Sequence, residues 1–534
     1  MTVHGLLAAC LLGCLGLLPA PARASRVRAP RVRIDSGALE GAYLPGLPQG
    51  TAFLGIPYAA QPVGNLRWKA PQLPPVWQGL RKATDYGPAC PQAPSSWLPE
   101  MLGIQKMPTD EACLYLNVWT PDLLKGSKLP VLVWVHGGGN VEGSGEWPPL
   151  GTTLARQGIV VVSFNYRLGA FGFFASSALS AESRHQVSGN YGHLDQVAAL
   201  RWVRRNIARF GGDPSRVTIA GQSSGALDIC NLMASPLARG LFQRAILQSG
   251  VCVDSVYPSL GEAEANGQLL AKDLSVEPGR RSLAELRALP AQRILQAAAK
   301  DPHVDLEPNI DGWFFPEQPA IAFARGRQAR VAVLVGSNAN EVSIFASPIV
   351  GGKSYRPKTV AAYRQWFQRE FGGLADKAFA EYPAHSDQEV PRTFNKMFTD
   401  FDFGFGARLM AVDTARIGQN AFLYRFTYVG AGKFAPLGAF HSEESMFLSK
   451  KYWTTWISRP YDKTLSNAII GYWVQFVKTG NPNQNGLPAW PVYHSGTDLC
   501  QELGRRIGQE PVPRAQRFSV FQQFLSSRLQ KYDH

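Results

Sequence analysis

Residues 221–225, Gly-Gln-Ser-Ser-Gly, have the types and spacing of a catalytic turn. They follow a short β-branched run at 217–219 and precede an apolar stretch at 226–233, which predicts a strand, a sharp turn and a helix. Because the flanking glycines bring no Cβ into the bend, such a turn can present the hydroxyl of Ser223 as a nucleophile. A plain Gly-Ser loop has the same composition, so this interpretation requires partners elsewhere in the chain.

A triple glycine supplies the first possible partner. The apolar run 131–135 leads into His-Gly-Gly-Gly at 136–139. Backbone N–H groups that no side chain covers can bind an oxyanion as it develops. A phosphate-binding loop is the competing functional interpretation, but the Gly-Lys-Ser/Thr ending of such loops is absent. A tight turn without a function is the remaining alternative.

An acid and a base follow two later runs. The run 331–335 leads to Glu341, and the run 422–427 leads through a glycine-rich loop to His441, one of only nine histidines. A carboxylate can orient a histidine and stabilise its protonated form. Each residue alone would be an ordinary loop residue. Together, the order Ser223, Glu341, His441 matches the chain order of the triad in α/β-hydrolases.

Strands and helices that alternate would position these residues. Buried strands are predicted at 131–135, 159–164, 217–220, 245–248, 331–335 and 422–427, and an amphipathic helix at 196–210. This alternation predicts an α/β fold with a mostly parallel central sheet and helices on both faces. Reactive groups then gather at the carboxyl ends of the strands. Helical patterns at 261–300 and 358–382 are expected to form insertions above the active site.

Length and composition favour a globular enzyme. The chain has 534 residues with 45% hydrophobic residues, and we find no repeat, linker or low-complexity tract. We therefore expect one domain over residues 25–534. The formal net charge of +14 is dispersed and no nucleic-acid motif is present, so no nucleic-acid partner is expected. No cluster of histidine and cysteine has the spacing of a metal site.

The first 24 residues resemble a secretory signal. The segment 6–18 is apolar, prolines follow it, and Ala22-Arg23-Ala24 fits a cleavage site. This predicts a secreted or periplasmic protein with no stable membrane span after cleavage. The lack of an Asn-x-Ser/Thr sequon and of an ER-retention ending favours a bacterial protein. An uncleaved anchor and lipid modification at Cys10 are the alternatives.

Export is consistent with the cysteines. Cleavage would leave five, so a monomer has at least one unpaired thiol. Cys90 and Cys113 are candidates for a disulfide in an oxidising compartment. The pairing of Cys230, Cys252 and Cys500 is left open.

The chain resembles the type-B carboxylesterases, the cholinesterase-like carboxylesterase/lipase family of α/β-hydrolases. The resemblance spans nearly the whole mature chain. It is carried by blocks in a fixed order: 53–59 (Phe-Leu-Gly-Ile-Pro-Tyr-Ala), 66–68 (Leu-Arg-Trp), 111–119 (Glu-Ala-Cys-Leu-Tyr-Leu-Asn-Val-Trp), 165–169 (Asn-Tyr-Arg-Leu-Gly), 189–192 (Gly-Asn-Tyr-Gly) and 210–214 (Phe-Gly-Gly-Asp-Pro).

The resemblance implies a role for each matching residue. Ser223 is the nucleophile, Glu341 the acid and His441 the base, with Glu444 completing the His-x-x-Glu motif. The oxyanion donors are the N–H groups of Gly138, Gly139 and Ser224, and Ser249 supports the triad from behind. The resemblance also implies a Cys90–Cys113 disulfide and the buried ion pairs Arg67–Glu111 and Arg167–Asp195.

Three residues depart from the family pattern. Gln222 replaces the usual glutamate of the elbow, Ser224 replaces an alanine, and Asn140 stands where an aromatic residue is common. The polar hydroxyl of Ser224 lies beside the nucleophile, and Asn140 leaves one wall of the pocket undefined. We expect these three positions to influence the choice of substrate.

The expected function is that of a secreted serine carboxylesterase. It would hydrolyse carboxylic esters of small molecules through an acyl-enzyme, with no metal or organic cofactor. Activity would fall in acid, near the reference pKa of about 6.5 for histidine. The alternatives are a non-catalytic cholinesterase-like binding protein and an amidase or thioesterase with the same triad. The natural ester and the oligomeric state are left open.

Overall fold

The computed structural model describes residues 28–532 apart from 94–106, 125, 278–281, 302, 303, 305, 346, 348–355 and 451–458. The expected signal segment, 1–24, lies outside the described residues. Within the described residues, no helix has the length and apolar character needed to cross a membrane.

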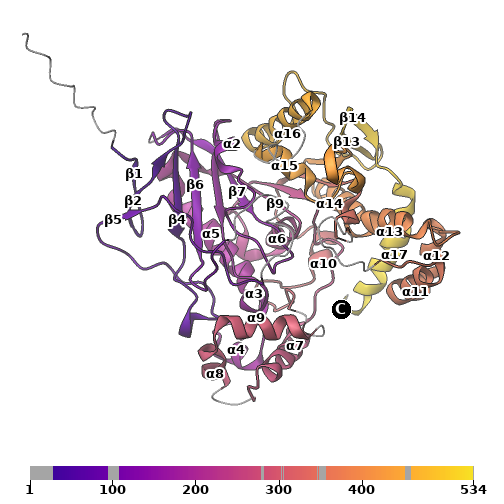
Figure 1. Cartoon of the computed structure of the whole chain (residues 1–534), viewed down its shortest axis with the longest axis horizontal. Helices are drawn as coiled ribbons and strands as arrows, with labels where there is room; N and C mark the ends of the chain where they lie inside the picture. The colour runs from indigo at the N-terminus through magenta and orange to yellow at the C-terminus, as the bar shows by residue number, and fades with distance from the viewer. Residues whose placement is uncertain are drawn as a thin grey trace, which may run out of the picture.

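An eleven-stranded sheet forms the centre of the described structure (Figure 1), in the order β14-β13-β12-β11-β10-β9-β7-β8-β6-β4-β3. Its middle is parallel from β8 to β13. The predicted runs lie in β7 (Leu129–Val135), β8 (Val160–Phe164), β9 (Gly212–Gln222), β10 (Arg244–Gln248), β11 (Ala332–Asn338) and β12 (Ala421–Phe426). The predicted fold class is therefore confirmed.

Antiparallel pairing completes the sheet at both ends. One end holds β3 (Ala42–Tyr43), β4 (Thr51–Pro57) and β6 (Tyr115–Thr120), and the other holds β13 (Leu499–Leu503) and β14 (Ile507–Pro511). A separate three-stranded sheet contains β1 (Arg31–Ile34), β2 (Gly37–Glu40) and β5 (Leu80–Lys82). These strands were not predicted, because their shorter or mixed patterns lack the continuous apolar runs of the buried parallel strands.

Helices cover both faces of the sheet. Val131 and Val133 belong to a core with α5 and α6, whereas Leu132 and Trp134 belong to a core with α16, as the alternation of side chains along β7 requires. The covering helices are α2 (Gly151–Ala155), α3 (Gly169–Phe173), α4 (Ser177–Glu182), α5 (Tyr191–Asn206), α6 (Ser224–Ala234), α10 (Pro319–Ala324), α14 (Phe405–Arg416), α15 (Glu443–Ser449) and α16 (Pro460–Thr479). The predicted helix at 196–210 corresponds to α5 and the following turn.

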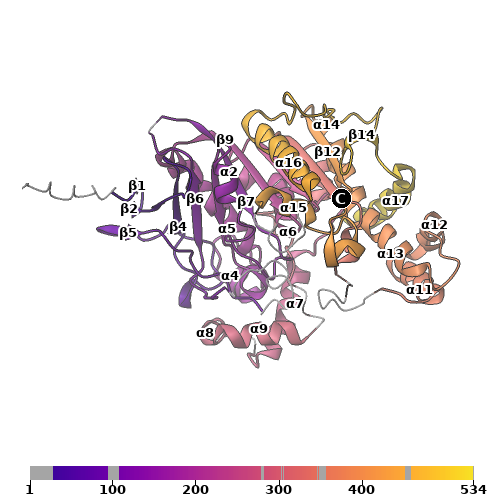
Figure 2. The ribbon, with the colours of Figure 1, turned by 45° about the horizontal axis from the view of Figure 1, so that its top comes forward.

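Two helical groups extend beyond the sheet (Figures 1 and 2). The first contains α7 (Leu260–Asp273), α8 (Ser282–Ala288) and α9 (Ala291–Lys300). The second contains α11 (Val360–Phe371), α12 (Ala375–Glu381), α13 (Val390–Thr399) and the C-terminal α17 (Phe518–Leu529). Aromatic residues such as Phe367, Phe394 and Phe521 form the core of the second group. This core joins segments that lie far apart in the sequence.

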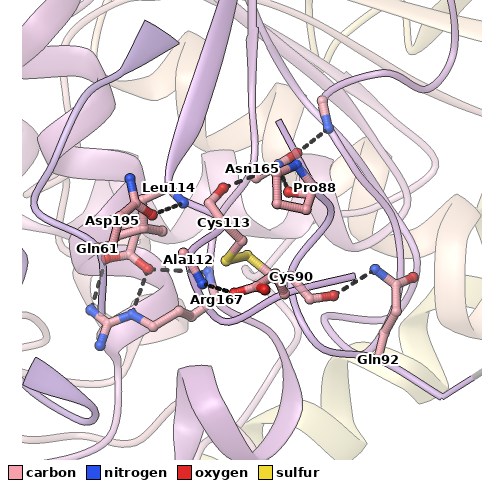
Figure 3. The surroundings of a disulfide bond; sticks show 12 residues. Gln61, Pro88, Cys90, Gln92, Ala112, Cys113, Leu114, Asn165, Arg167 and Asp195 are labelled. Atoms are coloured by element: carbon pink, nitrogen blue, oxygen red, sulfur yellow. Dashed lines mark hydrogen bonds and ion pairs between the residues drawn. A yellow bond between two sulfur atoms is a disulfide. The ribbon is translucent and has the colours of Figure 1, made fainter. Parts of the chain in front are cut away.

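Two disulfides tie the chain together. Cys90 is bonded to Cys113 at an S–S distance of 2.02 Å, and Cys230 on α6 is bonded to Cys252 after β10. Figure 3 shows Arg167 and Asp195 near the first bond. Arg167 donates to both carboxylate oxygens of Asp195, at 2.7 and 2.8 Å, and both side chains are buried.

The ion pair and the unpaired thiol expected from the sequence are also present. Arg67 donates to Glu111 through Nε at 2.7 Å. Among the cysteines that the structure describes, Cys500 is unpaired, and its burial shields it from an oxidising solvent.

Candidate active site

Ser223 stands on a strained turn between β9 and α6. Its φ of 58° and ψ of −132° lie outside the regions that residues other than glycine favour. The neighbouring helix begins at Ser224, and Gly225 lets it approach β7, because a Cβ at Gly225 would lie 2.3 Å from the carbonyl oxygen of Val135. This strain is of the kind that functional sites store. Ser223 is half-buried and lies at the carboxyl edge of the sheet.

The glycine loop after β7 lies against this turn. A Cβ at Gly137 would lie 3.0 Å from the Cβ of Ser223. Gly138 has a φ of +115°, and a Cβ there would lie 2.2 Å from the carbonyl oxygen of Glu142, so only glycine fits. In the described structure, the N–H groups of Gly138, Gly139 and Ser224 donate to no protein acceptor. The backbone donors are therefore available to a ligand beside Ser223.

Glu341 and His441 are brought together from two loops. Glu341 follows β11, and His441 lies 15 residues beyond the end of β12. The His441 Nδ1 lies 2.6 Å from Oε2 of Glu341, and Oε1 of Glu341 accepts a 2.6 Å bond from the N–H of Asn338. Glu341 is fully buried and His441 nearly so. Since an ionised carboxylate only accepts, Nδ1 carries the proton of this bond.

The other ring nitrogen of His441 contacts the elbow through Gln222. Its Nε2 lies 3.0 Å from Nε2 of Gln222, a buried side chain. Among the hydrogen bonds of the described residues, none joins the hydroxyl of Ser223 to His441. Ser223 and His441 thus lie at the same edge of the sheet. The amide of Gln222 contacts Nε2 of His441, the atom that would accept a proton from a nucleophile.

A second buried carboxyl lies behind Glu341. Glu444 accepts hydrogen bonds from Gln248 Nε2 at 3.0 Å and from Asn338 Nδ2 at 2.5 Å. Burial, together with the charge of Glu341, raises the pKa of Glu444. Ser249 follows β10 with a φ of 52°, and its N–H donates to Gly336. Its buried hydroxyl has no hydrogen-bond partner within the described structure. Ser249 therefore contacts its surroundings here through its backbone N–H rather than its hydroxyl.

Asn140 and Ser224, two of the departures from the family pattern, are bonded to each other. The N–H of Asn140 donates to Oγ of Ser224 at 3.2 Å. The side chain of Asn140 turns inwards and donates to Oδ1 of Asp228 at 2.9 Å. His193 and Gln196 also contact this carboxylate, at 3.0 and 2.6 Å. We refer to Asn140, His193, Gln196, Ser224 and Asp228 as the oxyanion-side network.

A cavity of about 420 Å³ opens beside Ser224 and Gly139. Aromatic and aliphatic side chains from the second helical group form much of its wall, including Phe401, Phe405, Phe521, Phe524 and Leu525. A cavity of this size, with aromatic walls and several polar side chains, suits a small organic molecule. It contacts the same backbone loop that carries the free N–H groups.

Three carboxyls also line this cavity, those of Asp254, Glu307 and Asp402, together with Arg528. Removal from bulk solvent, with the charge of Asp402 in addition, raises the pKa of Asp254 to about 8. Removal from bulk solvent likewise raises the pKa of Asp402 to about 6, and Glu341 adds to this shift. The charge of the cavity therefore becomes more negative as the pH rises through neutrality.

Sequence reasoning missed Asp228 and the cavity carboxyls Asp254 and Asp402, whose pKa values are raised. Asp228 lies on α6 five residues after Ser223, and a charged residue in an otherwise apolar helix was the signal that could have revealed it. Asp254 and Asp402 have no comparable signal, because folding alone brings them to one cavity. Among the described residues, no three of the types His, Cys, Asp and Glu are placed to hold a metal ion.

A mostly parallel sheet with a serine elbow after one strand and a glycine loop after its neighbour defines an α/β-hydrolase. The model of the carboxylesterase family matches residues 28–519, so the chain belongs to that family. Its members are serine hydrolases that act on carboxylic esters, and this chain is an enzyme of that class.

Individual relatives agree with this assignment. The chain is 38% identical to the fumonisin B1 esterase of Sphingopyxis macrogoltabida, over 89% of this chain and 86% of that protein. It is 35% identical to the para-nitrobenzyl esterase of Bacillus subtilis, over 87% and 93%. A solved thermophilic PNB esterase is similar with a TM-score of 0.80 and 33% identity, over 92% of this chain and 99% of that one.

Proposed function

We propose that this enzyme is an exported carboxylesterase that uses Ser223, Glu341 and His441 as its triad within one hydrolase domain, residues 25–534. The observation that carries the proposal is the 2.6 Å bond between Glu341 and His441 at the sheet edge that presents Ser223. Three free backbone N–H groups and a cavity with aromatic walls at the same edge support it.

The first chemical step forms an acyl-enzyme. His441 Nε2 accepts the proton of Ser223 as the hydroxyl oxygen attacks the carbonyl carbon of the ester. The N–H groups of Gly138, Gly139 and Ser224 stabilise the negative oxygen of the tetrahedral intermediate. As the intermediate collapses, the C–O bond breaks and His441 gives its proton to the leaving alcohol.

The second step reverses the roles. His441 takes a proton from a water molecule, which attacks the acyl carbon, and then returns the proton to Ser223 as the acid is released. Glu341 keeps the ring oriented and stabilises its charged form throughout. Each proton in this cycle moves between Ser223, His441, water and the leaving alcohol, so the scheme needs no cofactor.

The substrates are small-molecule esters. Printed names of relatives include a fumonisin B1 esterase and a para-nitrobenzyl esterase, which supports this class without selecting one ester. The two disulfides are consistent with an oxidising location outside the cytoplasm. A non-catalytic binding role is less well supported, because the chain retains a complete serine, acid and histidine set.

Replacement of the nucleophile tests this proposal. In Ser223→Ala, kcat for p-nitrophenyl butyrate is expected to fall by at least about 10³-fold. Ser215→Ala, an exposed serine at the other end of β9, should keep the wild-type rate. A folded Ser223→Ala enzyme with near wild-type turnover would overturn the assignment. A panel of matched esters, thioesters and anilides then separates the esterase from an amidase or thioesterase.

A further inference from the structure

The contact between Gln222 and His441 involves the atom on which the chemistry depends. Nε2 of His441 is the nitrogen that must take the proton of Ser223. In the structure it lies 3.0 Å from the amide nitrogen of Gln222. Only 2% of Gln222 is exposed, so water does not compete for this bond.

The direction of this hydrogen bond follows from the bond that the other ring nitrogen, Nδ1, makes with Glu341. Nδ1 donates to Glu341, so in the neutral ring Nε2 carries only a lone pair. The amide nitrogen of Gln222 can only donate. The bond therefore runs from Gln222 to His441 and occupies the lone pair that the hydroxyl of Ser223 would use.

We propose that Gln222 is a positioning residue that holds His441 neutral, with Nε2 directed at the elbow, until Ser223 takes its place. This inference rests on the proposed function. When the ring gains a proton, Nε2 becomes a donor, and the amide N–H of Gln222 can no longer face it. The charged ring therefore loses this bond, unless the amide rotates to present its oxygen.

The charged groups around His441 act in the opposite direction. Glu341 is bonded to the ring, Glu444 lies behind Glu341, and Asp402 approaches from the cavity. Each of these carboxyls favours a positive ring when it is ionised. The rings of Phe345 and Phe403, both with centroids 5.2 Å from that of His441, are neutral. Gln222 is thus the contact within the described residues that favours the neutral base.

Substitution at 222 should move the pH dependence of the enzyme. In Gln222→Glu, a carboxylate would accept from the protonated ring and stabilise it. The pH at which kcat/KM falls to half its plateau should then rise by about one unit or more. Gln222→Met keeps the side-chain length but cannot donate, and it should raise this pH by about half a unit to one unit.

The experiment measures kcat/KM for p-nitrophenyl butyrate between pH 5 and 9 in wild type, both variants and Ser224→Ala. The last variant alters the same elbow without contacting His441, so its half-maximal pH should match wild type. Thermal melting verifies that each variant is folded. The inference is supported if the half-maximal pH rises in both Gln222 variants and stays at the wild-type value in Ser224→Ala.

Three other outcomes separate the hypotheses. If hydrolysis depends on Ser223 but the half-maximal pH is the same in all four proteins, the role of Gln222 is wrong and the proposed function stands. If hydrolysis does not depend on Ser223, the proposed function fails, and with it the inference. If Ser224→Ala shifts as much as the Gln222 variants, the effect belongs to the elbow and the inference is overturned.

Discussion

The two sides of Ser223 are built in different ways. On the base side, Glu341, His441 and Gln222 are joined by two hydrogen bonds between side chains. On the oxyanion side, the available donors are backbone N–H groups, and the oxyanion-side network fixes the main chain that carries them. In the proposed mechanism protons move on the first side, whereas no group on the second side needs to titrate.

This difference predicts two kinds of mutant. Changes on the base side should alter both the rate and its pH dependence, because they change which form of His441 is stable. Changes on the oxyanion side should lower the rate while leaving the pH dependence in place.

Loss of the charge on Glu341 should have the largest effect. In Glu341→Gln the amide no longer stabilises the charged ring and can favour the wrong tautomer, so kcat should fall by about 10³–10⁴-fold. Rates measured from pH 6 to 9 should also show an altered profile. A loss of less than tenfold would show that this carboxylate does not serve the base.

Distortion of the glycine loop should have the next largest effect. Gly138→Ala would place a Cβ 2.2 Å from the carbonyl oxygen of Glu142 at a φ of +115°. The displaced N–H groups should cost about 10²–10³-fold in kcat. Steady-state kinetics across pH should give the wild-type half-maximal pH, and a shifted value would break the proposed separation of the two sides.

Removal of the Ser224 hydroxyl should have a small effect. Ser224→Ala keeps the backbone N–H but leaves the N–H of Asn140 without its acceptor. Loss of one such bond should lower kcat by about 2–10-fold, with little change in KM. Equal kcat values for the variant and wild type would mean that this bond does not order the oxyanion donors.

Much of the fold was predictable because the buried parallel strands are continuous apolar runs. Five of the six runs lead to a candidate catalytic or supporting residue at the carboxyl edge of the sheet, so chain order alone suggested a shared site. The Cys230–Cys252 bond was not predictable. Its partners meet because β9 and β10 are neighbours, which spacing in the sequence does not reveal.

The three unusual residues illustrate the limit of sequence reasoning. Sequence identified Gln222, Ser224 and Asn140 as departures and suggested that they shape the pocket. It did not show that Asn140, at a φ of 58°, directs its amide to the buried Asp228. Nor did it show that Gln222 contacts His441. Side-chain direction at such turns depends on tertiary packing, so only the structure could reveal these pairs.

Covalent trapping tests the central claim most directly. A fluorophosphonate ester mimics the tetrahedral intermediate and labels an activated serine, and intact mass followed by peptide mapping locates the adduct. We predict one phosphonyl group per chain, on Ser223, with slower labelling in Glu341→Gln and none in Ser223→Ala. Labelling of another residue, or labelling of Ser223→Ala at the wild-type rate, would contradict the account.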